Sequence, residues 1–149
     1  MKKVFLGLLV GLFGILSGCS AKKVSLSCQK EDNSMIDMKT AQTYTITFKK
    51  NKIARMETSS TIKVDGVYKK YTKELLESLE QQFATVKEKK GVTVKSKKEE
   101  NMVSAKATLD VTKMEKETKD SFTMLGLDLD KANQAKTKKG LEDQGFTCK

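Results

Sequence analysis

Three cysteines constrain the fold of this 149-residue chain more than any other feature. Cys19 ends an N-terminal segment typical of exported proteins, which leaves Cys28 and Cys148 as an even pair in a potentially oxidising compartment. We predict that these two are bridged, because the alternatives, a free-thiol nucleophile or a metal pair, have no histidine in the chain to assist them. A bridge that closes a loop of roughly 120 residues stabilises a fold by up to about 5 kcal/mol. It also requires the first and last segments of the domain to lie side by side.

The export segment consists of a charged start, an apolar run and a short box of small residues. Lys2 and Lys3 precede the apolar run from Val4 to Ile15. As a helix this run covers about 18 Å, well short of the roughly 30 Å of a membrane core. The box from Leu16 to Cys19 resembles the lipobox of bacterial lipoproteins. The resemblance implies a cleaved signal peptide, residues 1–18, and a diacylglyceryl thioether on Cys19. The alternative is an ordinary secretory signal with an incidental thiol.

Removal of residues 1–18 leaves 149 − 18 = 131 residues, the size of one domain. We divide them into the lipidated Cys19 with a short tether, residues 19–23, and a single domain, residues 24–149. The expected location is therefore the cell membrane, with the domain anchored by lipid on the extracytoplasmic side.

The mature chain is strongly basic. It carries 29 − 2 = 27 basic residues against 19 acidic ones, a net charge of +8, and Arg55 is its single arginine. Such a surface favours anionic lipid headgroups or anionic wall polymer, and the alternative is that the lysines occupy solvated turns and helix ends. Nucleic acid is not an expected partner, because the lysine clusters lack interleaved aromatics and arginine. These clusters are Lys49-Lys50, Lys69-Lys70, Lys89-Lys90 and Lys97-Lys98.

Alternation of apolar and polar residues predicts an antiparallel sheet. Val24 to Cys28 is predicted to be a short strand, followed by a polar link from Gln29 to Lys39. Residues 43–48 and 53–62 predict a β-hairpin around a turn at residues 50–52.

Apolar positions at helical spacing and end signals predict three helices. In the first, Leu75, Leu79 and Val86 share one face, and Gly91 marks the expected stop. A capping box at residues 112–115 is expected to open the second. The helices are expected at residues 72–89, 112–122 and 137–144, with a second hairpin at 92–94 and 103–111, a loop at 125–135 and a last strand at 146–148. The predicted class is α+β, an antiparallel β-sheet built from two hairpins plus terminal strands, with helices packed on one face.

Four runs of residues resemble the YehR-like bacterial lipoproteins, small lipid-anchored proteins whose domain has no known function. The resemblance spans nearly the whole mature chain and implies a compact α+β domain with an antiparallel sheet. It implies no catalytic or binding residues. The polar loop from Asp128 to Gln134 departs from the family, so that a site there would be specific to this protein. The runs are Tyr44 to Phe48, Met56 to Thr61, Lys90 to Val94, and Leu141 to Phe146 with Cys148.

The residues that carry most catalysis and metal binding are missing from the sequence. Without histidine there is no Ser-His-Asp or Cys-His arrangement, and we expect no enzyme activity, no metal and no cofactor. Carboxylate-only hydrolysis is an alternative, but Glu99-Glu100 lies in a predicted turn and Asp128 and Asp130 in a predicted loop. The scattered methionines are core filler or, alternatively, a Cu(I) site. The hydroxyls of residues 58–61 face solvent or, alternatively, a polar ligand.

The sequence therefore predicts a membrane-anchored lipoprotein that acts as a non-enzymatic binding or accessory module of the cell envelope. The alternative is an interaction or structural protein that holds anionic wall polymer or lipid through its lysines, and the remote alternative is a carboxylate-dependent hydrolase. Expected partners are the membrane, through lipid on Cys19, and an envelope protein or anionic polymer. A partly apolar cleft beside the sheet would favour ligand capture, whereas an exposed apolar patch would favour a protein partner.

Overall fold

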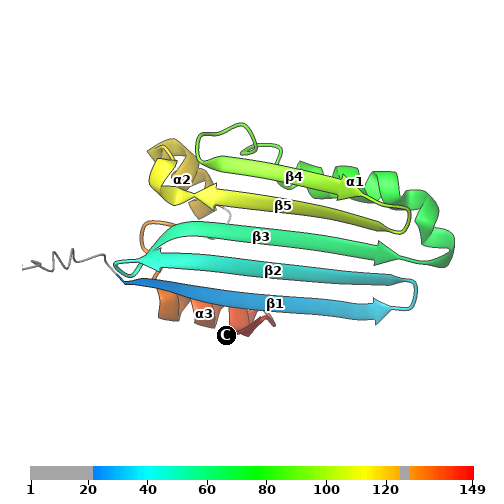
Figure 1. Cartoon of the computed structure of the whole chain (residues 1–149), viewed down its shortest axis with the longest axis horizontal. Helices are drawn as coiled ribbons and strands as arrows, with labels where there is room; N and C mark the ends of the chain where they lie inside the picture. The colour runs from blue at the N-terminus through cyan, green and yellow to red at the C-terminus, as the bar shows by residue number, and fades with distance from the viewer. Residues whose placement is uncertain (1–21, 125–127) are drawn as a thin grey trace, which may run out of the picture.

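The computed structural model describes residues 22–124 and 128–149, so the predicted signal peptide and the lipid site at Cys19 lie outside the described residues. The described chain forms an antiparallel six-stranded sheet in the order β4-β5-β3-β2-β1-β6, with three α-helices against one face (Figure 1). The predicted α+β class is confirmed. The strands are β1 (Lys23–Met35), β2 (Met38–Lys49), β3 (Lys52–Val64), β4 (Val92–Lys98), β5 (Met102–Asp110) and β6 (Thr147–Cys148). The helices are α1 (Thr72–Gln81), α2 (Lys116–Met124) and α3 (Gln134–Asp143), with 3-10 turns η1 (Gly66–Tyr71) and η2 (Val111–Lys113).

The long hairpin of β1 and β2 corrects one sequence prediction. The predicted polar link at residues 29–39 is instead strand: β1 continues to Met35, a turn at Ile36 and Asp37 follows, and β2 begins at Met38. Every residue from 29 to 35 is exposed, and so no apolar alternation marks this part of the strand.

The predicted hairpin of β2 and β3 is confirmed, and its turn lies at Lys50 and Asn51. Both residues have positive φ, 51° and 60°, as a type I′ turn requires. The pairing register then shifts by one residue, which leaves Ala54 as the extra residue of a β-bulge. The bulge allows Ile53 and Met56 to be buried in the same core.

The core lies between the sheet and the helices. Leu26, Ile46 and Phe48 of the first hairpin are each at most 2 % exposed. Burial of a side chain of this size stabilises a fold by about 1.5–3 kcal/mol. Phe122 of α2 and Leu129 of the following loop belong to the same buried cluster. In Figure 1 the helices lie behind the sheet, and the front face of the sheet is open.

Helix α1 is shorter than the sequence predicts. The predicted helix at 72–89 ends at Gln81, and residues 82–90 form a series of turns. Backbone N–H groups in these turns bond to carbonyls three residues back, and the β-branched Thr85 and Val86 lower the local helix propensity. Val86 is nevertheless 3 % exposed, which explains why apolar residues keep a helical spacing beyond the end of the helix.

The second predicted hairpin, β4 and β5, is confirmed, and it packs against α1 through small side chains. Val103, Ala105, Ala107 and Leu109 are each at most 3 % exposed. Leu79 of α1 is buried in the same cluster as Val103 and Ala105. Small side chains on this strand bring the helix and the sheet together without voids.

The predicted capping box at residues 112–115 is wrong. The Thr112 hydroxyl donates instead to Asp110 Oδ1, at 2.5 Å, and residues 111–113 form η2. Helix α2 begins only at Lys116. A hydroxyl that bonds its own turn cannot also satisfy the first N–H groups of a helix.

Helix α3 begins three residues before the predicted start at 137. Asn133 Oδ1 accepts a hydrogen bond of 3.0 Å from the Lys136 N–H and caps the helix. At the other end Gly145 has φ of +87° and turns the chain toward β6. The predicted stop at Gly145 is therefore confirmed.

The predicted bridge between Cys28 and Cys148 is present. The two residues lie directly opposite each other in β1 and β6. Beside them Ser27 and Lys149 exchange backbone hydrogen bonds of 3.0 and 2.8 Å. The first and last strands of the sheet are therefore neighbours, as the cysteine positions predict.

Candidate functional site

A cleft of about 390 Å³ lies between α3 and the middle strands of the sheet. Small-molecule pockets have volumes of roughly 300–1,000 Å³. The cleft is lined by three groups of residues, from β2 and β3, from the loop before α3, and from α3 with the residue that follows it. We call it the α3 cleft.

The sheet side of the α3 cleft is largely apolar. It is formed by Tyr44, Ile46 and Met56. The Tyr44 ring meets Phe146 edge to face, with centroids 5.3 Å apart. Since Phe146 lies two residues before Cys148, the bridged C-terminal segment helps to hold this wall in place.

The helix side of the α3 cleft combines a buried hydroxyl with open space. Thr137 is 8 % exposed, and its Oγ1 has no hydrogen-bond partner among the residues that the structure describes. A buried hydroxyl left in this state costs about 1–3 kcal/mol. One turn further on, a Cβ added to Gly140 would meet nothing within 4 Å. An unsatisfied polar group beside unfilled space is an arrangement that a ligand can complete.

The rim of the α3 cleft is charged. Lys131 and Lys136 line it together with Asp128. Asp128 Oδ1 accepts the backbone N–H groups of Asp130 and Lys131, at 3.2 and 3.0 Å, and its Oδ2 lies 3.6 Å from Lys131 Nζ. The Asp128 carboxylate is thus occupied in shaping the loop, and Lys136 forms no ion pair within the described ranges.

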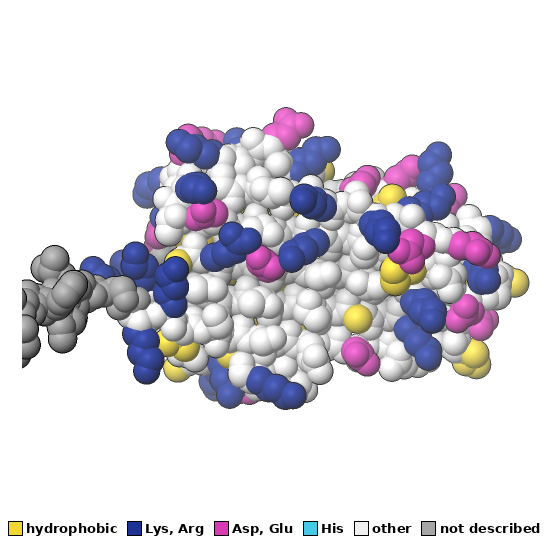
Figure 2. Space-filling view, viewed as in Figure 1, with side chains coloured by type: hydrophobic (Ala, Val, Ile, Leu, Met, Phe, Trp, Pro, Cys, Tyr) yellow, Lys and Arg dark blue, Asp and Glu magenta, His cyan; other side chains and the backbone are white. Residues whose placement is uncertain are grey.

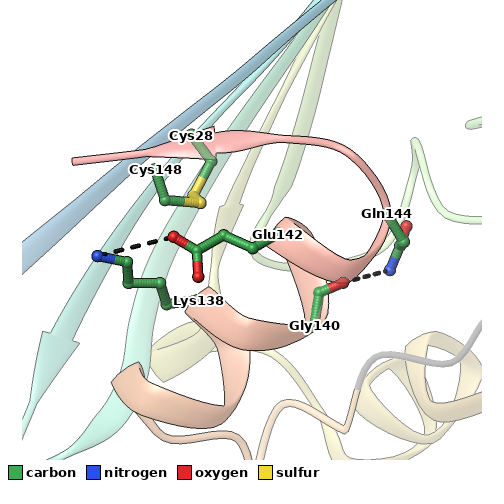
Figure 3. Close-up of a disulfide and its surroundings, with 6 residues drawn as sticks. All are labelled: Cys28, Lys138, Gly140, Glu142, Gln144 and Cys148. Carbon is green, nitrogen blue, oxygen red and sulfur yellow. Dashed lines mark hydrogen bonds and ion pairs between the residues drawn. A yellow bond between two sulfur atoms is a disulfide. The ribbon is translucent and has the colours of Figure 1, made fainter.

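The disulfide lies directly above α3 (Figure 3). On the helix an ion pair of 3.8 Å joins Lys138 to Glu142. After its last turn, the Gln144 side chain donates to the Gly140 carbonyl at 3.1 Å. The Lys30 ammonium, from β1, donates to the Gln144 carbonyl at 2.9 Å. These contacts fix the C-terminal end of α3 against β1, and with it one wall of the cleft.

From sequence, no residue of this cleft was nominated as a binding residue, and the polar loop at 128–134 was expected only to make any site there specific to this protein. The loop at 128–134 does contribute to the cleft, through Asp128 and Lys131. The sequence suggested a polar loop, but its Leu129 is only 1 % exposed and anchors the loop in the core. Thr137 and Gly140 were not singled out, although a glycine inside a helix is a signal of close approach or empty space.

The open face of the sheet is a second candidate surface, rich in hydroxyls and charges (Figure 2). At its centre Glu57 pairs with Arg55 at 2.7 Å and with Lys106 at 2.8 Å. The hydrogen bond from Lys106, and then that from Arg55, lowers the pKa of Glu57 below its ordinary value. The predicted hydroxyl row divides by strand alternation: Ser60 is buried on the helix side, whereas Ser59 lies on the open face.

Within residues 22–124 and 128–149, no three His, Cys, Asp or Glu residues cluster closely enough to hold a metal ion. Among the described residues, hydrogen bonds lower the pKa of the Asp32, Glu57 and Asp110 carboxyl groups below the ordinary value. No helix in the described ranges has the length and hydrophobicity to cross a membrane.

Comparison with known proteins gives one similar fold and no information on function. The structure is similar to an NMR structure of a protein from Streptococcus pneumoniae TIGR4, with a TM-score of 0.59 and 17% sequence identity. The match covers 100% of this chain and 98% of that one. No protein-family profile matches the chain, and no curated protein is significantly similar to it in sequence. At this identity the likeness shows a shared fold.

Proposed function

We propose that this protein is a membrane-anchored lipoprotein that acts as a non-enzymatic binding module of the cell envelope and holds a small amphiphilic ligand in the α3 cleft. The observation that carries the proposal is the unpartnered Thr137 hydroxyl beside the empty space at Gly140. A ligand with an acceptor oxygen would satisfy the hydroxyl. Its hydrocarbon part would cover the apolar wall, and Lys131 and Lys136 favour an anionic group at the rim.

The anchored location is supported by the sequence. The lipobox-like residues 16–19 follow a charged start and an apolar run of signal-peptide length. The YehR-like resemblance supports the same location. Lys23, the first residue of β1, is four residues after Cys19, which spans at most about 14 Å of extended chain. The domain would thus be held close to the membrane surface.

A thermal-shift panel tests ligand binding by the soluble domain, residues 20–149. The probes are octanoate, decanoate, a monoacylglycerol, N-acetylglucosamine and dipeptides. At 100 times its dissociation constant a ligand adds about 2.7 kcal/mol, which raises the melting temperature by several degrees. We expect the amphiphiles to give this shift. The absence of a shift with every amphiphile would overturn the proposed ligand class.

Two substitutions test the place of binding. Thr137→Val keeps the shape of the side chain and removes the unsatisfied hydroxyl, so the unliganded protein should be at least as stable while the ligand-induced shift falls. Gly140→Leu should fill the cleft and abolish the shift, and Gly140→Ala is its matched control. A full shift in both Thr137→Val and Gly140→Leu would place the ligand elsewhere.

Membrane fractionation with mass spectrometry tests the anchor. In a bacterium that expresses the full chain, Cys19→Ser should lose the lipid mass and move from the membrane to the soluble fraction. The double variant Cys28→Ser/Cys148→Ser is the control, because it removes thiols without touching the predicted lipid site and should stay at the membrane. Unmodified Cys19 in the wild-type protein would exclude a lipoprotein.

The two alternative functions differ in their support. A hydrolase needs a carboxylic acid that stays protonated near neutral pH, which requires a raised pKa. The three shifted carboxyl groups, Asp32, Glu57 and Asp110, have lowered values. The lysine-surface alternative has a specific observation in its favour, the grouping of lysines at one end of the sheet.

A further inference from the structure

Four lysines gather at the end of the sheet where the chain enters it. Lys23 lies opposite Lys49 in the β1–β2 pairing, Lys49 lies opposite Lys52 in the β2–β3 pairing, and Lys50 forms the turn. All four are exposed. We call them the anchor-end lysines. Figure 2 shows basic side chains, in dark blue, at this end of the sheet.

The acidic groups near the anchor-end lysines are already paired with other lysines. Asp110 binds Lys113 at 3.1 Å, and Asp130 binds Lys119 at 3.1 Å. No ion pair joins an anchor-end lysine to an acidic side chain among the residues that the structure describes. Neighbouring strands are about 4.8 Å apart, and so these like charges are held close together. An anionic surface would relieve their repulsion.

The opposite end of the sheet has a different character. The large exposed hydrophobic side chains of the described chain are Met35, Ile36, Val67 and Tyr71, which are 44%, 96%, 68% and 44% exposed. They belong to the β1–β2 turn and to η1, which follows the far end of β3. Along β2, Met38 at this end is 11 residues, or about 36 Å, from Lys49. Lysines occur at both ends, among them Lys39 opposite Lys63 at the far end, but within the described residues the large exposed hydrophobic side chains lie at the far end alone.

We propose that the anchor-end lysines bind anionic lipid headgroups and hold the domain upright, with the long axis of the sheet pointing away from the membrane. The inference rests on the proposed lipid anchor, which brings Lys23 to within about 14 Å of the lipidated Cys19. The far end of the sheet is about 36 Å from Lys49, which is several Debye lengths of about 8 Å. Each lysine near such a surface contributes about fivefold to binding, or about 1 kcal/mol.

Vesicle cosedimentation tests this binding without the lipid. The piece used is residues 20–149, which contains every described strand and helix and the disulfide. Vesicles of phosphatidylcholine are compared with vesicles that also contain phosphatidylglycerol. We expect binding to the anionic vesicles alone, and its loss as salt approaches 1 M, where the Debye length is about 3 Å. Equal binding to both kinds of vesicle would overturn the proposal.

Two matched triple variants test which lysines act. Lys49→Gln/Lys50→Gln/Lys52→Gln removes three charges at the anchor end and should weaken binding about 100-fold. The control, Lys39→Gln/Lys63→Gln/Lys98→Gln, removes three exposed charges at the far end and should weaken it less than about threefold. Circular dichroism checks that both variants are folded. Equal losses in the two variants would show attraction by net charge and overturn the upright orientation.

A tryptophan reporter gives an independent measure of orientation, because the chain has no tryptophan. Ser25→Trp places the reporter on the exposed side of β1 near the anchor end, and Ile36→Trp places it in the far turn. Anionic vesicles should shift the emission of the first and leave the second unchanged. The reverse pattern would mean that the apolar end meets the membrane.

The remaining outcomes separate this inference from the others. Tighter binding to a soluble polyphosphate-type wall polymer than to anionic vesicles would make the polymer the partner and overturn lipid binding. Thr137→Val and Gly140→Leu should bind vesicles as the wild type does, because the α3 cleft takes no part. Failure of the cleft proposal and failure of the membrane proposal are therefore distinguishable.

Discussion

The strands β1 and β2 are paired from Lys23 and Lys49 to Met35 and Met38, with one register shift after Asp32, but the two halves of this hairpin have different environments. Near the anchor end, Leu26 and Ile46 are buried under the helices, at 2% and 1% exposure. Toward the far turn, all of residues 29–36 are exposed. An isolated two-stranded hairpin is at best marginally stable in water. The exposed half persists because β3 pairs with β2 over its whole length, as far as Met38 and Val64. The buried side chains of the covered half supply the stability, and the exposed half only lengthens the hairpin.

Loss of the disulfide should give the largest loss of stability, since the bridge joins the covered half of β1 to the last strand, β6. Cys28→Ala/Cys148→Ala should lower the free energy of unfolding by about 3–5 kcal/mol. Urea denaturation of the variant, compared with oxidised and reduced wild type, measures the loss. An unchanged midpoint in both comparisons would mean that the covered half holds without the bridge.

Two isoleucines of the same hairpin provide the most direct comparison. Ile46→Ala in the covered half should cost about 2–5 kcal/mol, because it leaves a cavity in the core. Ile36→Ala at the far turn, where the side chain is 96% exposed, should cost less than about 0.5 kcal/mol. Thermal unfolding measures both. Similar costs would contradict the division of the hairpin into two environments.

Two glycines allow a similar comparison, because one lies in crowded surroundings and the other has free space beside its Cα atom. A Cβ on Gly91, which has φ of +83°, would lie 2.7 Å from the Asp110 carbonyl oxygen, so Gly91→Ala should destabilise by about 1–3 kcal/mol. Gly140→Ala meets no atom within 4 Å and removes a glycine from a helix, so it should stabilise by about 0.5–1 kcal/mol. Denaturant midpoints of the two variants should therefore move in opposite directions, and shifts of the same sign would contradict this account.

The smallest expected effect concerns Glu57 on the open face. Its pKa in the folded protein is lowered, first by Lys106 and then by Arg55, so its contribution to stability is present above the ordinary pKa and is lost as pH falls through the folded value. Glu57→Gln should cost less than about 1 kcal/mol at pH 7, since the pair is partly exposed, and nothing near pH 2. Unfolding of both proteins across this range measures the difference. A difference between the two proteins that does not change with pH would mean that the ion pairs of Glu57 do not contribute to stability.

The same contrast explains which parts of the fold could be predicted from sequence. Strands with one covered face show a clear alternation of apolar and polar residues, as around Ile46 and Phe48, and the hairpins β2–β3 and β4–β5 were predicted from it. The exposed extension of β1 beyond Cys28 leaves no such pattern, because neither face is apolar. The predicted range of helix α1, 72–89, was too long for the opposite reason. Val86 lies beyond the end of the helix but is buried, so an apolar pattern continues where the helix does not. The spacing of apolar residues indicates which side chains are buried. It indicates a helix only where the backbone is also helical.

The candidate site was less predictable than the fold. The α3 cleft depends on where α3 lies against β2 and β3, and that position is set by contacts between residues more than a hundred positions apart, such as Lys30 with Gln144. That the Thr137 hydroxyl is unpartnered is a property of this packing and of no local sequence pattern. The sequence shows a local cluster of positive charge at Lys49, Lys50 and Lys52. That Lys23 lies beside this cluster follows only from the strand register of the folded sheet.

The bridge between Cys28 and Cys148 also determines how mechanical load passes through the molecule. It makes residues 28–148 a closed covalent ring. Tension between the membrane anchor and whatever is attached after Cys148 would run along the tether, across the two sulfur atoms and out again. The ring would carry none of that tension. Residues 23–28 of β1 would lie on the line of force, whereas the rest of the sheet, the helices and the α3 cleft belong to the ring, so a pull along this path would leave the binding site unloaded.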